Sequence, residues 1–296
     1  MTTHSAPTPI PLTCLITGAS GSNGRELVKR FIAQGVEVRA MVRDMERARD
    51  LARPGVELVT GDFDQHATLR VALNGIERAF LLTPSSEHAE TQQRAFVETA
   101  QASGVKHIVK LSQLGARPDS PERFLRYHAA VEDTIRASGL DYTFLRPNLF
   151  MQTLLSFKAT IEAQGAFFAA AGEGRVSVVD VRDIAAVAFA ALTQEGHVGQ
   201  TYDITGPQAL THAEMAAQLS HALGRTVRFV DVALDAMRHA LLEAHFPVWQ
   251  ADGLLEEYAA WSQNAAAVVT PAVANVTGRA PHSFAEFARD YASELG

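Results

Sequence analysis

Three glycines with a regular spacing are the residues whose chemical use is clearest. They lie between a short apolar segment at 12–17 and an amphipathic segment at 23–34. In a strand–turn–helix unit, such glycines let backbone N–H groups approach a pyrophosphate, and the helix N-terminus adds free donors and partial positive charge. An ordinary glycine-rich turn is the alternative. The residues predicted to bind the dinucleotide phosphates are Gly18, Ser20, Gly21, Ser22, Asn23 and Gly24.

A single basic residue indicates which dinucleotide would bind. Arg43 ends the alternating apolar segment 36–42. A site that prefers NAD places an acidic residue here for the ribose hydroxyls, whereas a guanidinium suits the additional 2′-phosphate of NADP. We therefore predict NADP(H) as cofactor, with NAD(H) less favoured but not excluded because Asp44 follows directly. A role as a solvated surface residue is the alternative for Arg43.

Further cofactor contacts are expected after the third and fourth apolar segments. Asp62 and Phe63 follow the segment 56–60 and would meet the adenine, unless Asp62 only forms a turn that caps the next helix. Leu82, Thr83 and Pro84 follow the fourth segment, at the sheet edge where such folds bind ligands.

The tyrosine–lysine pair that many dehydrogenases use for proton transfer is absent. The residues four positions after the five tyrosines, Tyr127, Tyr142, Tyr202, Tyr258 and Tyr291, are Val131, Arg146, Gly206, Ser262 and Leu295. Because none is lysine, an epimerase, a lyase or an alcohol dehydrogenase built on that pair is disfavoured.

His128 stands where the lysine of the pair is expected, with Phe124 in the tyrosine position. One turn later Glu132 shares its helical face, so the two side chains are expected to hydrogen-bond. A histidine here binds the nicotinamide ribose or relays a proton near neutral pH, and a purely structural histidine is an equal alternative. His128 is the first catalytic candidate and Tyr127 a weaker one.

The spacing of apolar residues predicts the elements that hold these side chains. Amphipathic segments separate short apolar ones, and this alternation predicts an α/β fold with a doubly wound parallel sheet of the Rossmann type. The segments predicted as strands are 12–17, 36–42, 56–60, 79–82, 107–111 and 141–145.

The pattern becomes less regular in the second half of the chain. It predicts helices at 149–163, 184–192 and 213–223, strands at 201–204 and 227–230, and mostly helix thereafter. The expected division is a flexible tail at 1–11, a NAD(P)-binding domain at 12–148, and a smaller, mainly helical substrate-binding part at 149–296 whose segments at about 176–205 return to the sheet.

Composition excludes several classes of protein. Twenty-six basic and 33 acidic residues give a net charge of −7, which argues against nucleic acid or an anionic membrane as partner. One cysteine cannot form an internal disulfide, and the eleven histidines show no ligand spacing, so we expect no metal site. No apolar run is long enough to cross a membrane. We expect a cytoplasmic enzyme.

Several of these segments resemble the NmrA-like atypical short-chain dehydrogenases. The resemblance rests on the glycine run, Val42-Arg-Asp44, Gly61-Asp-Phe-Asp64, His128 with Glu132, Tyr142-Thr-Phe-Leu-Arg-Pro147, 179–184 and 202–207, and it covers about 12–230. Within that family the chain is most similar to the bacterial NADPH:quinone oxidoreductases and triphenylmethane reductases. The plant reductases of the wider family carry lysine in place of His128, so their chemistry is not expected here.

The resemblance implies that Leu145, Pro147 and Asn148 lie against the nicotinamide, and that Asp183 is structural. It implies hydride transfer from NADPH to a quinone, a cationic dye or an imine, acceptors electrophilic enough to react without a dedicated proton donor. A non-catalytic NADP(H) sensor is the alternative, and a homodimer is possible. The side chains proposed to line an aromatic substrate's slot, or else to pack in the core, are Phe150, Met151, Phe167, Phe168, Phe246, Trp249 and Trp261.

Overall fold

A seven-stranded parallel sheet is the centre of the computed structural model, which describes residues 14–296. The tail predicted for 1–11, and the first two residues of the strand predicted for 12–17, lie outside the described residues. In their order across the sheet the strands are β3 (Val56–Thr60), β2 (Val38–Val42), β1 (Cys14–Ile16), β4 (Arg78–Leu81), β5 (His107–Leu111), β6 (Asp141–Pro147) and β9 (Gln200–Ile204).

The order of the strands reverses direction at the centre of the sheet. The chain runs outward from β1 to β3 and then returns to add β4, β5 and β6 on the other side of β1. Loops at the carboxyl ends of strands next to such a switch point diverge and leave a crevice for ligands. The predicted α/β class with a doubly wound parallel sheet is confirmed.

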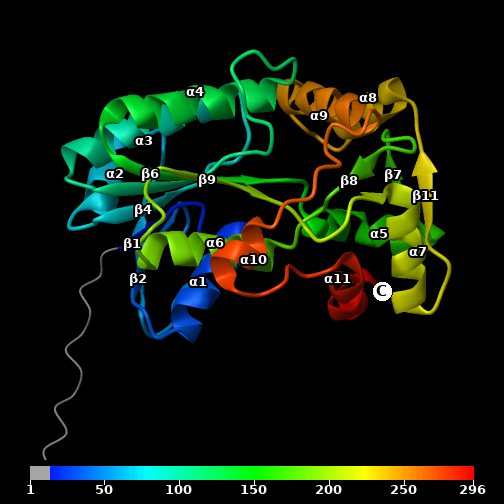
Figure 1. The fold of residues 1–296 in the computed structure, drawn as a ribbon, viewed down its shortest axis with the longest axis horizontal. Coiled ribbons are helices and arrows are strands. Elements are labelled where there is room, and N and C mark those ends of the chain that lie inside the picture. The colour runs from blue at the N-terminus through cyan, green and yellow to red at the C-terminus, as the bar shows by residue number, and fades with distance from the viewer. Residues whose placement is uncertain (1–13) are drawn as a thin grey trace, which may run out of the picture.

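Helices cover both faces of the sheet, as its apolar strands require (Figure 1). One face carries α1 (Ser22–Ala33), α6 (Val181–Thr193) and α10 (Ala272–Thr277). The other carries α2 (His66–Leu73), α3 (Ala89–Ala102) and α4 (Arg123–Ser138). Two separate apolar clusters result, one on each side of the sheet.

A third apolar cluster holds together the C-terminal elements beyond the sheet. Two small two-stranded sheets belong to this part, β8 with β10 antiparallel and β7 with β11 parallel. Its strands are β7 (Ala166–Ala169), β8 (Arg175–Val176), β10 (Leu210–Thr211) and β11 (Arg228–Asp231). Its helices are α5 (Lys158–Gln164), α7 (His212–Leu223), α8 (Leu234–Glu243), α9 (Val248–Trp261), α11 (Phe284–Asp290) and α12 (Ala292–Leu295). A short 3₁₀ turn, η1 (Arg49–Leu51), belongs to the N-terminal half.

The long helix predicted for 149–163 is wrong over its first half. Met151 N–H donates to the Val179 carbonyl and Val179 N–H donates to the Leu149 carbonyl, both at 2.9 Å, so the chain is extended there. A 3₁₀ helix, η2 (Met151–Phe157), follows, and α5 begins only at Lys158. Apolar spacing alone does not distinguish a buried extended segment from a helix.

Other predictions for the second half agree with the structure. The helices predicted at 184–192 and 213–223 are α6 and α7, and the strand predicted at 201–204 is β9, which extends the main sheet beyond β6. The strand predicted at 227–230 is β11. The strands β7, β8 and β10 were not predicted, because two to four residues are too few to show a period. Among the described residues no helix is both long and apolar enough to span a membrane.

Candidate active site

The glycine run forms the tight turn between β1 and α1. Gly18 has a positive φ of 62°, a conformation that side-chain-bearing residues rarely adopt. A Cβ on Gly24 would lie 2.2 Å from the Gly18 carbonyl oxygen and 2.6 Å from Ala19 Cα, so only glycine fits. The predicted tight turn with close helix packing is therefore what the structure shows at this position.

The N-terminus of α1 offers unused polar groups. Its N-cap is Gly21, which supplies no side chain to the helix, and its first turn holds no acidic residue. The first N–H groups of a helix have no intrahelical acceptors. Ser20, Gly21 and Ser22 are exposed, and Asn23 is buried with its Oδ1 lacking a hydrogen-bond partner. These groups fit a bound diphosphate and an adjoining hydroxyl.

Arg43 follows β2 at the carboxyl edge of the sheet, beside the glycine turn. Its side chain is exposed and makes no ion pair or hydrogen bond within residues 14–296. Asp44 instead accepts hydrogen bonds from the backbone N–H groups of Glu46 and Arg47, at 2.9 and 3.2 Å, and pairs with the Arg47 side chain. The guanidinium of Arg43 is thus available to a phosphate.

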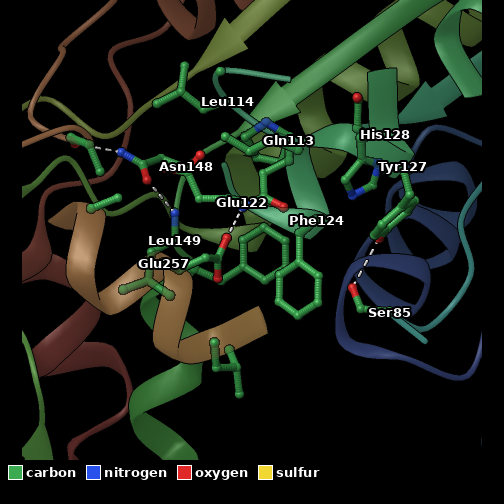
Figure 2. A pocket seen from close by; sticks show the side chains of 18 of the residues that line it. Ser85, Gln113, Leu114, Glu122, Phe124, Tyr127, His128, Asn148, Leu149 and Glu257 are labelled. Atoms are coloured by element: carbon green, nitrogen blue, oxygen red, sulfur yellow. Dashed lines mark hydrogen bonds between the residues drawn. The ribbon is translucent and has the colours of Figure 1, made fainter. Parts of the chain in front are cut away.

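A cavity of about 510 Å³ opens along the same edge of the sheet. Residues after β4, β5 and β6 form its base, and residues of α4 and α9 form its walls (Figure 2). The exposed surface of the wall is mainly apolar, and polar side chains such as His128, Tyr127 and Glu257 are set into it. Such a shape is typical of a site for a small organic ligand.

His128 lines this cavity from α4, and its ring is hydrogen-bonded to a buried lysine. Lys110 Nζ lies 2.7 Å from His128 Nδ1, and both side chains are buried. When Lys110 is protonated it can only donate, so Nδ1 then accepts and Nε2 carries the ring proton. Nε2 makes no hydrogen bond within residues 14–296. Lys110 was missed because a lysine in the apolar strand segment 107–111 gives no sign of its partner on α4.

Burial sets the ionisation of this pair. Burial, and then the charges of Lys110 and Arg146, hold the pKa of His128 well below its usual range, so the imidazole is neutral. Burial also lowers the pKa of Lys110 to about 7, although the Glu132 carboxylate opposes the shift. His128 can therefore present a neutral N–H donor to a ligand in the cavity.

The predicted hydrogen bond between His128 and Glu132 is wrong. Glu132 instead accepts hydrogen bonds from Ser112 Oγ at 2.5 Å and from the Arg146 guanidinium at 2.9 and 2.5 Å. Arg136 also pairs with this fully buried carboxylate. A buried carboxylate needs a cationic partner, and the arginine from β6 satisfies that need better than a neutral imidazole.

Tyr127 lies beside His128 on the cavity wall. Its hydroxyl is 3.1 Å from Ser85 Oγ, and its ring centroid is 4.1 Å from that of His128 (Figure 2). Burial raises the pKa of Tyr127 far above its usual value of 10.0. The phenol therefore holds its proton tightly, and it is a hydrogen-bond donor or acceptor rather than an acid at neutral pH.

The helix α9 closes the opposite side of the cavity with a buried acid that was not predicted. Glu257 is 7% exposed and accepts a hydrogen bond from the Gln113 side-chain amide (Figure 2). Arg123 anchors this helix to α4 through Glu256, at 3.0 and 2.8 Å. Gln113 and Glu257 are 144 positions apart, so no local pattern links them.

The two residues predicted to meet the adenine are mostly engaged in the fold. Asp62 Oδ1 accepts a hydrogen bond from Asp64 N–H at 3.0 Å, which is the alternative Asx turn. Phe63 is 9% exposed and packs against Phe96, with ring centroids 5.7 Å apart.

The residues after β4 divide into two groups. Leu82 and Thr83 line the cavity, and Thr83 Oγ1 accepts a hydrogen bond from Gln93 at 2.8 Å. Pro84 is exposed and does not belong to the cavity wall.

The residues around the end of β6 also differ in position. Pro147 and Asn148 line the cavity, whereas Leu145 is fully buried in the core beneath it. The Asn148 amide is committed to the fold, since it donates to Ser177 Oγ and to the Ala266 carbonyl, both at 2.8 Å. Asp183 is not part of the cavity wall. It accepts two hydrogen bonds, at 2.8 and 2.7 Å, from His282, which lies 99 positions later in the chain.

The side chains proposed to line a substrate slot occupy three kinds of position. Phe150 and Trp261 line the main cavity. Met151, Phe167 and Phe168 line a smaller adjoining pocket of about 60 Å³, which Trp261 shares. Trp249 packs against Phe124, with centroids 5.3 Å apart, and Phe246 lies in neither cavity wall.

Known proteins share this sequence and this fold. The NmrA-like family matches residues 12–288. The chain belongs to the NmrA-like family. The predicted family is thereby confirmed. An NAD(P)H azoreductase of Xenophilus azovorans is 40% identical over 282 residues, which are 95% of this chain and 99% of that protein.

Two solved structures of this family's fold match nearly the whole chain. The quinone oxidoreductase QOR2 of Escherichia coli, complexed with NADPH, has a TM-score of 0.84 and 27% identity and covers 94% of this chain and 99% of its own. The triphenylmethane reductase of Citrobacter sp., complexed with NADP(H), has a TM-score of 0.83 and 28% identity, with 95% and 100% covered.

Proposed function

We propose that this member of the NmrA-like family is an NADPH-dependent oxidoreductase that reduces electrophilic, conjugated acceptors: quinones, azo compounds, imines and cationic dyes. One observation carries the proposal. The glycine turn, the unpaired Arg43 and a mainly apolar cavity of about 510 Å³ occupy one edge of the sheet. The names of the azoreductase, the quinone oxidoreductase and the triphenylmethane reductase support the same class of reaction.

The cofactor is assigned to the groups that fit its parts. The turn from Gly18 to Gly24 and the first turn of α1 hold the diphosphate, and Arg43 holds the 2′-phosphate. Asp62 and Phe63 border the adenine. Leu82, Thr83 and Pro84 contact the part of the cofactor between the diphosphate and the nicotinamide. Pro147 and Asn148 form the wall beside the nicotinamide, supported by Leu145 beneath them.

The chain's own contribution to the reaction is mainly orientation and exclusion of water. When bound, NADPH supplies a hydride to the acceptor. His128, held at Nδ1 by Lys110, would use its Nε2 to orient the nicotinamide end of the cofactor. Tyr127, beside His128, and Phe150 and Trp261, elsewhere in the cavity wall, confine a flat acceptor. Holding two reactants in contact in this way lowers the entropic part of the barrier.

A panel of acceptors tests the proposal. Purified protein is mixed with NADPH and, in separate reactions, a quinone, an azo dye, a cyclic imine and a cationic triarylmethane dye, and NADPH absorbance is followed. We expect acceptor-dependent oxidation with at least one of them and a preference for NADPH over NADH. Tight binding of NADPH without oxidation by any acceptor would instead identify a non-catalytic NADP(H) sensor.

Several sequence-based statements remain predictions. They are the cytoplasmic location, the absence of nucleic-acid and membrane partners, the homodimer, and the division between a cofactor-binding part at 12–148 and a substrate-binding part at 149–296.

A further inference from the structure

We propose that Glu257 is the general acid of this enzyme, which protonates the heteroatom of a quinone or azo acceptor as hydride is added. The inference rests on the proposed function and deepens it. It assigns a chemical role to α9, a helix for which the sequence suggested only the shaping of a pocket. It also divides the acceptors into those that need a proton and those that do not.

The position of Glu257 is suited to an acid. The carboxyl group lies in the wall of the cavity that holds His128 on its other side. Gln113 donates a hydrogen bond to Oε1, which fixes the orientation of the carboxyl group. The other oxygen, Oε2, has no hydrogen-bond partner in the described range 14–296. One carboxyl oxygen is therefore held by the protein and the other is available to a substrate.

The other titratable groups of the cavity wall are less suited to donate a proton. His128 carries a single ring proton and stays neutral, so it can give up that proton only if Lys110 protonates Nδ1 at the same time; the Lys110→Met variant below tests this relay. Tyr127 is bonded to Ser85 and holds its proton tightly. Glu122 is engaged by Ser120 Oγ. Arg117 is paired with Asp119, at 3.5 Å.

The surroundings of Glu257 favour its protonated form. The pKa of Glu257 is raised to about 7, mainly by burial. The charges of Glu122 and Glu256 raise this pKa further, whereas the hydrogen bond from Gln113 lowers it. The remaining ionisable neighbours are Tyr258 on the same helix, Tyr127 and Arg123 on α4, and Arg117. Arg123 pairs with Glu256 rather than with Glu257. A pKa close to the working pH is what general acid catalysis requires.

The proposed step balances for an azo acceptor. The hydride forms an N–H bond on one nitrogen, and the N=N π bond breaks and leaves its electron pair on the other nitrogen. The Glu257 O–H bond breaks and its proton forms the second N–H bond. The acceptor is reduced by two electrons to a hydrazo compound, NADPH is oxidised by two, and the Glu257 carboxylate regains a proton from water.

A cationic triarylmethane dye provides an internal control. Hydride addition to its central carbon gives a neutral product directly, so no proton is consumed. Replacement of Glu257 by Gln keeps the shape of the side chain and removes the acidic proton. The variant should therefore lose azo reduction and retain dye reduction.

The experiment measures kcat for an azo dye and for a triarylmethane dye between pH 5 and 9. For Glu257→Gln we expect the azo kcat to fall about 100-fold, the usual size of a general acid's contribution, and the triarylmethane kcat to stay within about twofold. Wild-type azo kcat should fall as pH rises through about 7, since the acid loses its proton, and that dependence should vanish in the variant. Asp252→Asn, five residues earlier on α9 and paired with Arg238 at 2.8 Å and with Arg123 at 4.0 Å, lies outside the cavity wall, is the matched control and should behave as wild type.

Equal losses with both dyes, or no loss with either, would overturn the role of Glu257 while leaving the proposed function intact. Failure of the wild-type protein to reduce any acceptor would overturn both. Lys110 also has a pKa of about 7, so Lys110→Met is included: the azo pH dependence should persist in it and disappear only in Glu257→Gln.

A readout without cofactor or acceptor is the pH dependence of thermal unfolding. Because burial raises the pKa of Glu257 from 4.5, the folded protein keeps this proton between pH 4.5 and about 7 whereas the unfolded chain releases it. The contribution of this proton to the free energy of unfolding is fully present below pH 4.5 and is lost as pH rises through about 7. Glu257→Gln should remove that part of the pH dependence of Tm, and an unchanged profile would contradict the proposal.

Discussion

At the scale of single residues, Arg43 is the side chain to which we assign the choice of cofactor. It stands at the end of β2 with its guanidinium exposed and without an acidic partner in the part of the chain that the structure describes. Its neighbour Asp44, which might have favoured NAD, is occupied by two backbone N–H groups and by Arg47. A free guanidinium at this position is suited to a 2′-phosphate and has no corresponding partner in NADH.

Replacement of Arg43 by Ala is expected to raise the Kd of NADPH about 10- to 100-fold and to leave that of NADH within about twofold. The reason is the loss of charge-assisted hydrogen bonds, worth about 1.5–3 kcal/mol. Fluorescence titration of NADPH and NADH measures both constants. Arg228→Ala removes another exposed arginine, on β11, and should change neither. Equal weakening of both cofactors by Arg43→Ala would contradict the assignment.

At the scale of elements, β5 and α4 form a unit that fixes the orientation of one imidazole. The strand contributes Lys110 from its interior, and the helix packed on the sheet contributes His128, with their nitrogens 2.7 Å apart. Ser112, directly after β5, and Glu132 on α4 meet at 2.5 Å next to Arg146. Because all these groups are buried or half-buried on regular elements, their geometry is held rigidly.

His128→Ala is expected to lower kcat at least about tenfold while the Kd of NADPH changes by less than about threefold, because the ring orients the bound cofactor rather than supplying affinity. Lys110→Met should lower kcat in the same direction, and the double variant should be no worse than His128→Ala, since both act through one interaction. Steady-state kinetics with a quinone and binding titrations provide the two readouts. Wild-type kcat in His128→Ala would leave this histidine with a structural role only.

The elements that were predictable are those whose signal is local. The glycine run, the alternation in 36–42 and the apolar segments 107–111 and 141–145 each carry their own periodicity, and the resulting strands form the predicted sheet. The prediction failed at 149–163, where contacts with Val179 override the apolar spacing.

The parts of the site that escaped prediction depend on contacts between distant segments. Lys110 is 18 positions from His128, and Gln113 is 144 positions from Glu257. Neither pair leaves a pattern along the chain. The expected bond between His128 and Glu132 illustrates the same limit: their spacing on α4 permits it, but Lys110 and Arg146 from neighbouring strands supply better partners.

At the scale of the whole molecule, the C-terminal half completes the cavity that the sheet begins. The helix α9 is tied to α4 by Arg123 and Glu256, and a Cβ on Gly253 would lie only 2.5 Å from the Phe124 ring. This close packing places Trp261 and Glu257 opposite the carboxyl edge of the sheet. In the proposed function, cofactor selection by the first half and acceptor binding by the second half meet in this one cavity.

The central claim is direct transfer of hydride from NADPH to an acceptor inside this cavity. The most direct measurement uses NADPH deuterated at C4, in separate 4R and 4S forms, with a cationic triarylmethane dye and mass analysis of the colourless product. We predict that one of the two labelled forms, and only one, delivers deuterium to the central carbon of the dye, since a C–D bond formed by direct transfer does not exchange with water. A reduced product without deuterium from either form, or no product despite tight binding of NADPH, would contradict the claim.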